Sequence, residues 1–306
     1  MTLTTTTPAP AAFAPTTLRI EPLTVRTGAV IHGVRLSGDL PDALIAEIRQ
    51  ALLRHKVIFF RGQEHLDEAA HEAFTARLGK LLPHPARDPL AGTQATLNLD
   101  SRDTRSSTWH TDLTFLNAYP QISVLRGVRI PPLGGDTLWA NTVTAYEHLP
   151  TQFKAFVDGL WAVHSNVFDY SALIPAGTEQ SSGVFHRQLA RRETIETEHP
   201  VVTVHPETGE RALLLGHFVK RLVGFNSADS AHLLAILNAH AIADENLVRW
   251  RWTQGDVVIW DNRATLHKAV DDYGQVERIV RRVTVVGTHA TAVDGRVSVT
   301  RSASSS

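Results

Sequence analysis

The chain has 306 residues, of which 43% are hydrophobic and 20% charged, and its formal net charge is −1. This composition is typical of a globular protein, and the near-zero charge gives no general attraction to nucleic acid or acidic membranes. Cysteine is absent, which excludes disulfides and metal sites built from thiolates.

The two ends of the chain differ in composition from the rest. The first residues are rich in Thr, Ala and Pro, and the last are rich in Ser. The start lacks the basic residues and apolar core of a signal peptide, and no apolar run approaches the roughly 20 residues that span a bilayer. The sequence predicts disordered tails over 1–17 and 300–306, one folded domain over 18–299, and a cytoplasmic protein with no membrane or nucleic-acid partner.

Helical and extended patterns alternate through the first two thirds of the chain. Amphipathic spacing predicts helices over 41–56, 65–80, 145–160 and 229–241. A wholly apolar strand is expected at 57–60. Further strand candidates are 93–100, 108–116, 122–128 and 137–140.

The last third is the clearest β region. We expect a hairpin over 201–215 with its turn at 205–209, and strands at 248–252, 257–260, 265–270 and 278–286. Many short strands separated by turns predict a mainly β protein with flanking helices. With a metal site inside, the fold that fits best is the double-stranded β-helix, the jelly roll of the cupin type.

The most informative motif is His110-Thr111-Asp112, in a run that reads as a strand. Residues i and i+2 of a strand share a face, so His110 and Asp112 could reach one metal ion together. His267 lies far downstream in another alternating segment. Two histidines and one carboxylate form the facial triad of non-heme Fe(II) oxygenases. Taken alone, His110 and Asp112 fit an ordinary strand hydrogen bond equally well.

The same spacing occurs in His65-Leu66-Asp67, which begins a helical segment. Residues i and i+2 of a helix do not share a face, so this pair cannot act together. We expect His65, Asp67 and nearby His71 on the solvated surface. Glycine-rich phosphate loops and the GxSxG motif are absent from the chain.

Two arginines, Arg278 and Arg282, stand four residues apart in an otherwise apolar strand. Both face the same side, with Cα atoms roughly 13 Å apart at about 3.3 Å per residue. Such a strand should be substantially buried, and buried guanidinium groups need anions beside them. Those anions are either bound ligands or internal Asp and Glu side chains, and the sequence leaves both open.

These features lie in segments that resemble the Fe(II)- and 2-oxoglutarate-dependent dioxygenases of the taurine dioxygenase group. The resemblance covers nearly everything from Thr24 to Gly287. The matching segments are HKVIFFRGQ (55–63), WHTDLTF (109–115), GGDTLWANT (134–142), EHPVVTVHPETGERAL (198–213), RWRWTQGDVVIWDNRATLH (249–267) and RIVRRVTVVG (278–287). Within the group, LWAVHSN (160–166) and GHFVKR (216–221) look most similar to the bacterial alkylsulfatase dioxygenases.

The resemblance implies a metal and co-substrate site. His110, Asp112 and His267 match the iron ligands of the family, and they would also be its catalytic centre. Thr137 and Arg278 match the pair that holds the far carboxylate of 2-oxoglutarate. The cofactors implied are Fe(II), 2-oxoglutarate as co-substrate, and O2.

The resemblance also implies a substrate site. His84 and Arg282 match residues that bind the sulfonate or sulfate of the substrate, with help from the backbone N–H of Leu113. Phe218 matches a residue near the substrate pocket. Each arginine of the pair would then meet its own anion, and a planar guanidinium suits both carboxylate and sulfate.

The activity implied is hydroxylation of the carbon next to the sulfate ester of an alkyl sulfate, releasing aldehyde and inorganic sulfate with succinate and CO2. Where taurine enzymes hold the substrate amine with a tyrosine and an asparagine, this chain has Arg87 and Ser106. An arginine repels an ammonium group, which favours an uncharged or anionic tail over taurine.

Several alternatives remain on the sequence alone. Within the class, the chain could be a taurine or sulfonate dioxygenase, or a related oxygenase acting on another anionic small molecule. Outside it, the same triad could serve a zinc hydrolase through a metal-bound water, or a non-catalytic cupin-like binding protein. The resemblance implies a homo-oligomer, either a dimer or a tetramer.

Overall fold

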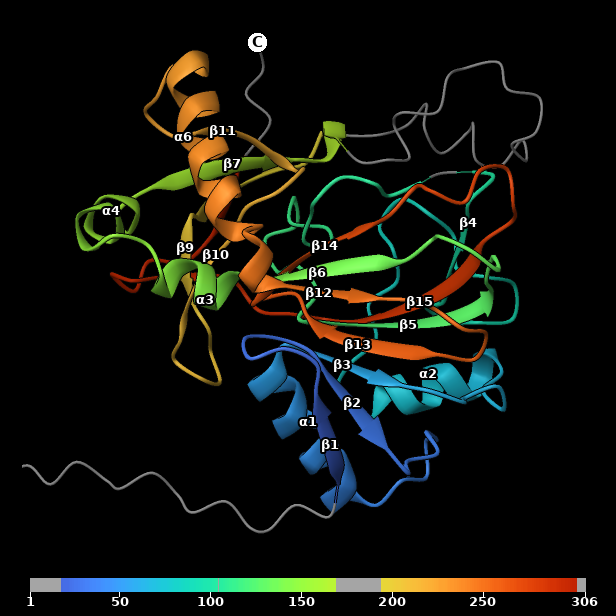
Figure 1. Cartoon of the computed structure of the whole chain (residues 1–306). Coiled ribbons are helices and arrows are strands. Elements are labelled where there is room, and N and C mark those ends of the chain that lie inside the picture. Colours follow the sequence, from blue (N-terminus) through green and yellow to red (C-terminus); the bar gives the residue numbers. More distant parts are fainter. Residues whose placement is uncertain (1–17, 104, 169–193, 302–306) are drawn as a thin grey trace, which may run out of the picture.

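The computed structural model describes residues 18–103, 105–168 and 194–301, and two sheets lie at its centre (Figure 1). The strands of the large sheet are, in spatial order, β1 (Arg19–Pro22), β2 (Ala29–His32), β3 (Val57–Phe60), β13 (Val257–Asp261), β5 (Ile122–Arg129), β15 (Ile279–Val285) and β4 (Leu97–Asp100). The small sheet consists of β12 (Leu247–Trp250), β6 (Thr137–Asn141) and β14 (Thr265–Ala269). Neighbouring strands are antiparallel except for β2 and β3.

Two smaller sheets and several helices surround this pair. The sheets are β11 (Val219–Leu222), β7 (Trp161–Ser165), β8 (Glu196–Pro200) and β17 (Val299–Arg301), and β10 (Arg211–Leu213), β9 (Val202–Val204) and β16 (Thr291–Ala292). The helices are α1 (Asp42–His55), α2 (Glu68–Ala76), α3 (Thr142–Glu147), α4 (Thr151–Val157) and α6 (Ser227–Ala241), with 3₁₀ turns η1 (Asn166–Phe168) and η3 (Asp244–Asn246). None of the helices in the described residues is long and apolar enough to cross a membrane.

The strand β3 is apolar at every position because both of its faces are covered. Val57 and Phe59 point into the space between the two central sheets. Ile58 and Phe60 belong to a second core on the outer side of the large sheet, where α1 and α2 pack (Figure 1). The neighbouring strand β13 divides its side chains in the same way. A strand buried on both faces loses the usual apolar–polar alternation.

Aromatic side chains fill the space between the central sheets. Phe59 stacks on Trp250 with ring centroids 4.2 Å apart, and its edge meets Trp139 at 5.5 Å. Trp139 and Trp260 are almost completely buried. This dense core holds β6, β13 and β14 in fixed positions, and these strands position the residues of the site.

The predicted architecture is confirmed: the chain is mainly β, with helices outside a cupin-like jelly roll. The predicted helix 145–160 is wrong as one element, because α3 ends at Glu147 and α4 begins at Thr151. Pro150 lies directly before α4, and a proline cannot continue a preceding helix. The paired backbone of β17 reaches Arg301, past the domain end predicted at 299. The remaining tail residues, 1–17 and 302–306, lie outside the described residues.

The prediction for the segment 65–71 is partly wrong. Asp67 caps the N-terminus of α2 by accepting a hydrogen bond from the backbone N–H of Ala70 at 2.8 Å. His71, however, is fully buried. It shares the inner stripe of α2 with Phe74 and Thr75, at the i, i+3 and i+4 spacing that a helix directs to one side.

The packing of α1 on the large sheet can be tested with a matched pair of substitutions. Leu52 is on the buried face of α1 and is 1% exposed, whereas Leu133 is 73% exposed in a loop. We expect Leu52→Ala to lower the free energy of unfolding by about 2–5 kcal/mol, because it leaves a cavity in a packed core. Leu133→Ala should change it by less than about 0.5 kcal/mol. Urea denaturation measures both, and equal losses would contradict this packing.

Candidate metal centre and its pockets

The segment that contains His110 and Asp112 is a docked loop. The strand predicted over 108–116 is wrong: only His110 makes a bridge, and turns follow it. Leu113 has a φ of 50°, in the left-handed region that non-glycine residues seldom adopt. The chain therefore bends away directly after Asp112.

Each residue of the HTD triplet contacts β14 or the turn that leads into it from β13. His110 and His267 exchange two backbone hydrogen bonds, of 3.0 and 2.8 Å. The hydroxyl of Thr111 donates to the carbonyl of Thr265 at 2.8 Å. The backbone N–H of Asp112 donates to Oδ1 of Asn262 at 3.3 Å. These contacts, and not a shared strand face, bring the three side chains together.

His110, Asp112 and His267 form a group whose potential ligand atoms all lie within 4.8 Å of one another. The Nε2 atom of each histidine is 3.8 Å from the same carboxylate oxygen, Oδ1 of Asp112. All three side chains are buried. Two imidazoles and one carboxylate therefore face a single point from three directions.

The protonation states of these groups suit a cation. Nδ1 of His110 lies 2.8 Å from the carbonyl of Thr108. A carbonyl can only accept, so Nδ1 carries the proton and Nε2 keeps its lone pair. Burial lowers the pKa of His110, and burial with the nearby His110 ring holds the pKa of His267 well below its usual range. Both imidazoles are therefore neutral at neutral pH.

Asp112 is ionised in spite of its burial. Burial alone would raise its pKa, but the positive charge of Arg282 and a hydrogen bond from Ser123 lower the pKa to about 2. The guanidinium of Arg282 contacts Oδ1. The hydroxyl of Ser123 donates to Oδ2 at 2.7 Å.

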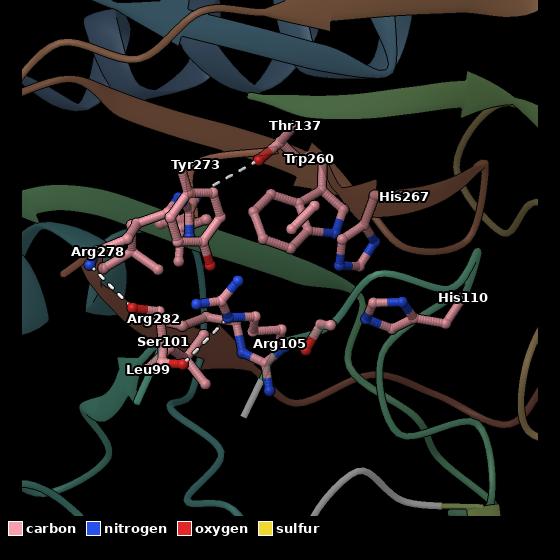
Figure 2. Close-up of a pocket in the computed structure, with 14 residues that line it drawn as sticks. Leu99, Ser101, Arg105, His110, Thr137, Trp260, His267, Tyr273, Arg278 and Arg282 are labelled. Carbon is pink, nitrogen blue, oxygen red and sulfur yellow. Dashed lines mark hydrogen bonds between the residues drawn. The ribbon is translucent and has the colours of Figure 1, made fainter. Parts of the chain in front are cut away.

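A pocket extends from the two histidines to Arg278, which lies at its opposite end (Figure 2). Arg278 donates from Nε to the carbonyl of Gly135 at 3.0 Å and from Nη2 to Oγ1 of Thr137 at 3.4 Å. Thr137 also accepts from Nε1 of Trp252 at 3.0 Å. No carboxylate among the described residues lies within ion-pair distance of Arg278.

The two arginines thus differ in their partners. Both line the same pocket together with Val280, as the alternation along the strand predicts. Arg282 has an internal anion, Asp112. Arg278 is buried and makes no ion pair with any described residue; burial lowers its pKa, and the charge of Asp136, which pairs with Arg249, opposes this from a distance. The sequence left open whether the anions beside these arginines are internal carboxylates or bound ligands. An internal carboxylate accounts for Arg282, and a bound ligand remains the explanation for Arg278.

A second pocket adjoins the first at His110 and Arg282, and Asp112 lines it as well. Its lining includes every residue predicted from the resemblance to contact substrate, namely His84, Leu113, Phe218 and Arg282, together with Arg87 and Ser106. Phe218 reaches it because its loop lies against the HTD segment. Gly216, with a φ of 102°, allows this approach, since a Cβ there would lie 2.9 Å from the carbonyl oxygen of Trp109.

Sequence reasoning missed several residues around these pockets. Arg105 and Tyr273 line the first pocket, with the guanidinium carbon 4.7 Å from the tyrosine ring centroid. Ser123 and Asn262 contact Asp112 from behind. Isolated residues in loops or at strand ends form no spacing pattern that would mark them in the sequence. Asn262 is the exception, because it lies in the segment 249–267 that resembles the dioxygenase family.

Several known proteins are similar to this chain. An alpha-ketoglutarate-dependent sulfate ester dioxygenase of Pseudomonas putida is 52% identical over 282 residues, which cover 92% of this chain and 93% of that protein. An alkylsulfatase of Acinetobacter baylyi is 50% identical over 285 residues, covering 91% and 88%. The crystal structure of a taurine dioxygenase from Burkholderia xenovorans superposes with a TM-score of 0.80 at 39% identity, covering 95% and 96% of the two chains.

The family comparison covers nearly the whole described fold. A model described as taurine catabolism dioxygenase TauD, TfdA family matches residues 19–284. That span includes the HTD loop, both pockets and both arginines. The resemblance drawn from the sequence motifs is confirmed, and the chain belongs to the taurine catabolism dioxygenase TauD, TfdA family.

Proposed function

We propose that the protein is an Fe(II)- and 2-oxoglutarate-dependent oxygenase that hydroxylates the carbon next to the sulfate ester of alkyl sulfates. The products would be an aldehyde, inorganic sulfate, succinate and CO2. The observation that carries the proposal is a buried group of two histidines and one aspartate that borders two pockets, of which Arg278 lines the first and Arg282 lines both. The names of the two relatives that are 50–52% identical support the substrate class.

The residues present fit Fe(II). His110 and His267 are neutral, and Asp112 is ionised, so each offers a lone pair at neutral pH. Two nitrogen ligands and one carboxylate leave positions open on a six-coordinate metal. This donor set would hold Fe(II), and the open positions suit 2-oxoglutarate and O2.

Thr137 and Arg278 would hold the far carboxylate of 2-oxoglutarate. Arg278 is buried and lacks an internal anion, while its Nε and Nη2 atoms are fixed by Gly135 and Thr137. A guanidinium fixed in this way binds a carboxylate at little entropic cost. The opposite end of 2-oxoglutarate would then point along the pocket toward the histidines.

Bound Fe(II) supplies the activation of oxygen and the oxidation of the substrate carbon, which no side chain of the protein could perform. The protein selects the carbon that reacts. Arg282, His84 and the backbone N–H of Leu113 would bind the sulfate end, and they line the pocket that begins at Asp112. Fixing the sulfate would bring the adjacent carbon, in preference to the rest of the chain, toward the metal site.

The rest of this pocket suits an alkyl tail. Its wall includes Leu97, Leu99 and Phe218, which offer apolar surface. Arg87 also lines it, and an arginine opposes the ammonium group of taurine. A sulfonate remains the second candidate, because the solved taurine dioxygenase is similar over nearly the whole chain. We further propose a cytoplasmic homo-oligomer, a dimer or tetramer, as the resemblance implies.

The ligand assignment can be tested with matched aspartate substitutions. We expect Asp112→Ala to reduce succinate formation to background, because two histidines alone hold the metal weakly. Asp67→Ala removes the other aspartate with the His-x-Asp spacing. It should cost about 1 kcal/mol of stability through the lost helix cap, with near-normal turnover. Steady succinate formation by Asp112→Ala would refute the assignment.

Because the two arginines are proposed to bind different ligands, substituting each should raise the KM for a different substrate. Arg278→Lys should raise the KM for 2-oxoglutarate, and Arg282→Lys the KM for the alkyl sulfate. Each loses a bidentate charge-assisted contact worth about 1.5–3 kcal/mol, or roughly 10- to 150-fold. Initial rates with each substrate varied in turn measure both constants. A rise in the same constant for both variants would contradict separate roles.

Product analysis distinguishes the substrate classes. With iron-loaded protein, 2-oxoglutarate, O2 and hexyl sulfate, we expect sulfate and succinate in equal amounts. With taurine, the repulsion from Arg87 should leave sulfite release far below the sulfate release from hexyl sulfate. Sulfite from taurine at a comparable rate would favour the sulfonate dioxygenase. Succinate without either product would keep the oxygenase chemistry and reject both substrates.

A further inference from the structure

Behind Asp112, on the side away from the pockets, lies a short chain of buried hydrogen bonds. Ser123 is on β5 and is fully buried, and its hydroxyl donates to Oδ2 of Asp112 at 2.7 Å. Asn262 directly follows β13 and is 1% exposed. Its Nδ2 donates to the hydroxyl oxygen of Ser123 at 2.8 Å.

The donor and acceptor of each hydrogen bond between Asn262, Ser123 and Asp112 can be assigned from the neighbouring groups. The indole Nε1 of Trp260 and the backbone N–H of Asp112 can only donate, and both point to Oδ1 of Asn262, at 3.0 and 3.3 Å. The amide nitrogen of Asn262 must therefore face Ser123. Because Ser123 accepts that bond, its single hydroxyl proton goes to Oδ2 of Asp112.

Backbone hydrogen bonds hold Ser123 and Asn262 in place. The N–H of Asn262 donates to the carbonyl of Gln121 at 2.9 Å. The preceding residue, Asp261, is buried and accepts from Arg263 at 2.8 Å. Ser123 is held in the ladders that β5 forms with β13 and β15. The backbone of both residues is therefore fixed by the large sheet and its connections.

We propose that Ser123 and Asn262 are positioning residues that commit Oδ2 of Asp112 to the protein and present only Oδ1 to the metal. Oδ1 is the oxygen that lies 3.8 Å from Nε2 of both histidines. A carboxylate held in this way would bind a metal through Oδ1 alone, so that Oδ2 would not take up a further position on the metal. The inference rests on the proposed ligand role of Asp112.

The test measures metal binding directly. Apo protein is titrated with Mn(II), and free Mn(II) is followed by electron paramagnetic resonance. We expect Ser123→Ala to weaken the Kd about 10- to 100-fold, the usual effect of removing a hydrogen bond to a metal ligand. The visible spectrum of the Co(II)-loaded variant should also change, because a freed Oδ2 alters the coordination of the metal.

A matched control separates this effect from a general loss of stability. Ser230 is 2% exposed on α6, remote from the triad, and its hydroxyl oxygen accepts one backbone hydrogen bond, from Leu222 at 3.2 Å. Ser230→Ala should keep the parent Kd and Co(II) spectrum. Asn262→Ala should weaken Mn(II) binding at least as much as Ser123→Ala. The double variant should lose less affinity than the sum of the two single losses, because Asn262 acts partly through Ser123 and partly through its own contact with Asp112.

The outcomes separate this inference from the proposed function. A parent-like Mn(II) affinity in Ser123→Ala, or an equal loss in Ser230→Ala, would overturn the inference and leave the ligand set intact. Full additivity in the double variant would also overturn it, since it would show two independent contributions. If the parent binds Mn(II) no more tightly than His110→Ala, the ligand set itself fails, and the inference fails with it.

Discussion

The site depends on the docking of the HTD loop against β14 and the turn that joins it to β13. A backbone bridge joins His110 to His267, and Thr111 and Asp112 add one hydrogen bond each to the same segment. Residues 150 or more positions apart in sequence are thereby fixed within hydrogen-bonding distance. A metal site needs this rigidity, because ligand atoms must be held close together before the ion binds. The aromatic core between the central sheets supports the receiving segment from below.

Much of the fold follows from local patterns. The sequence predicted the apolar runs of β3 and β13, the hairpin of β9 and β10, and the alternation in β15, because each is carried by several neighbouring residues. The strand predicted over 108–116 failed because Trp, Thr, Leu and Phe favour extended structure on average. Tertiary contacts overrode that preference here. His110 and Asp112 converge as predicted, although a docked loop brings them together instead of a shared strand face.

The contacts that complete the site could not be read from the sequence. The bonds from Ser123 to Asp112 and from Asn262 to Ser123 depend on the register between β5 and β13, which is set by long-range packing. Whether each arginine meets an internal carboxylate depends likewise on the position of its guanidinium group in the folded structure. Spacing predicted that both would be buried on one face. Only the structure distinguishes the arginine beside an internal carboxylate from the one without.

That difference has an electrostatic consequence for the substrate. Among the buried side chains that line the two pockets, Asp112 carries one negative charge, Arg278 and Arg282 carry two positive charges, and the histidines are neutral. Fe(II) and dianionic 2-oxoglutarate cancel each other, so the assembled site retains one positive charge. A sulfate monoester neutralises that charge, whereas zwitterionic taurine leaves it in place and adds an ammonium group. Because uncompensated buried charge is costly, the balance favours a substrate with a single negative charge and an apolar tail.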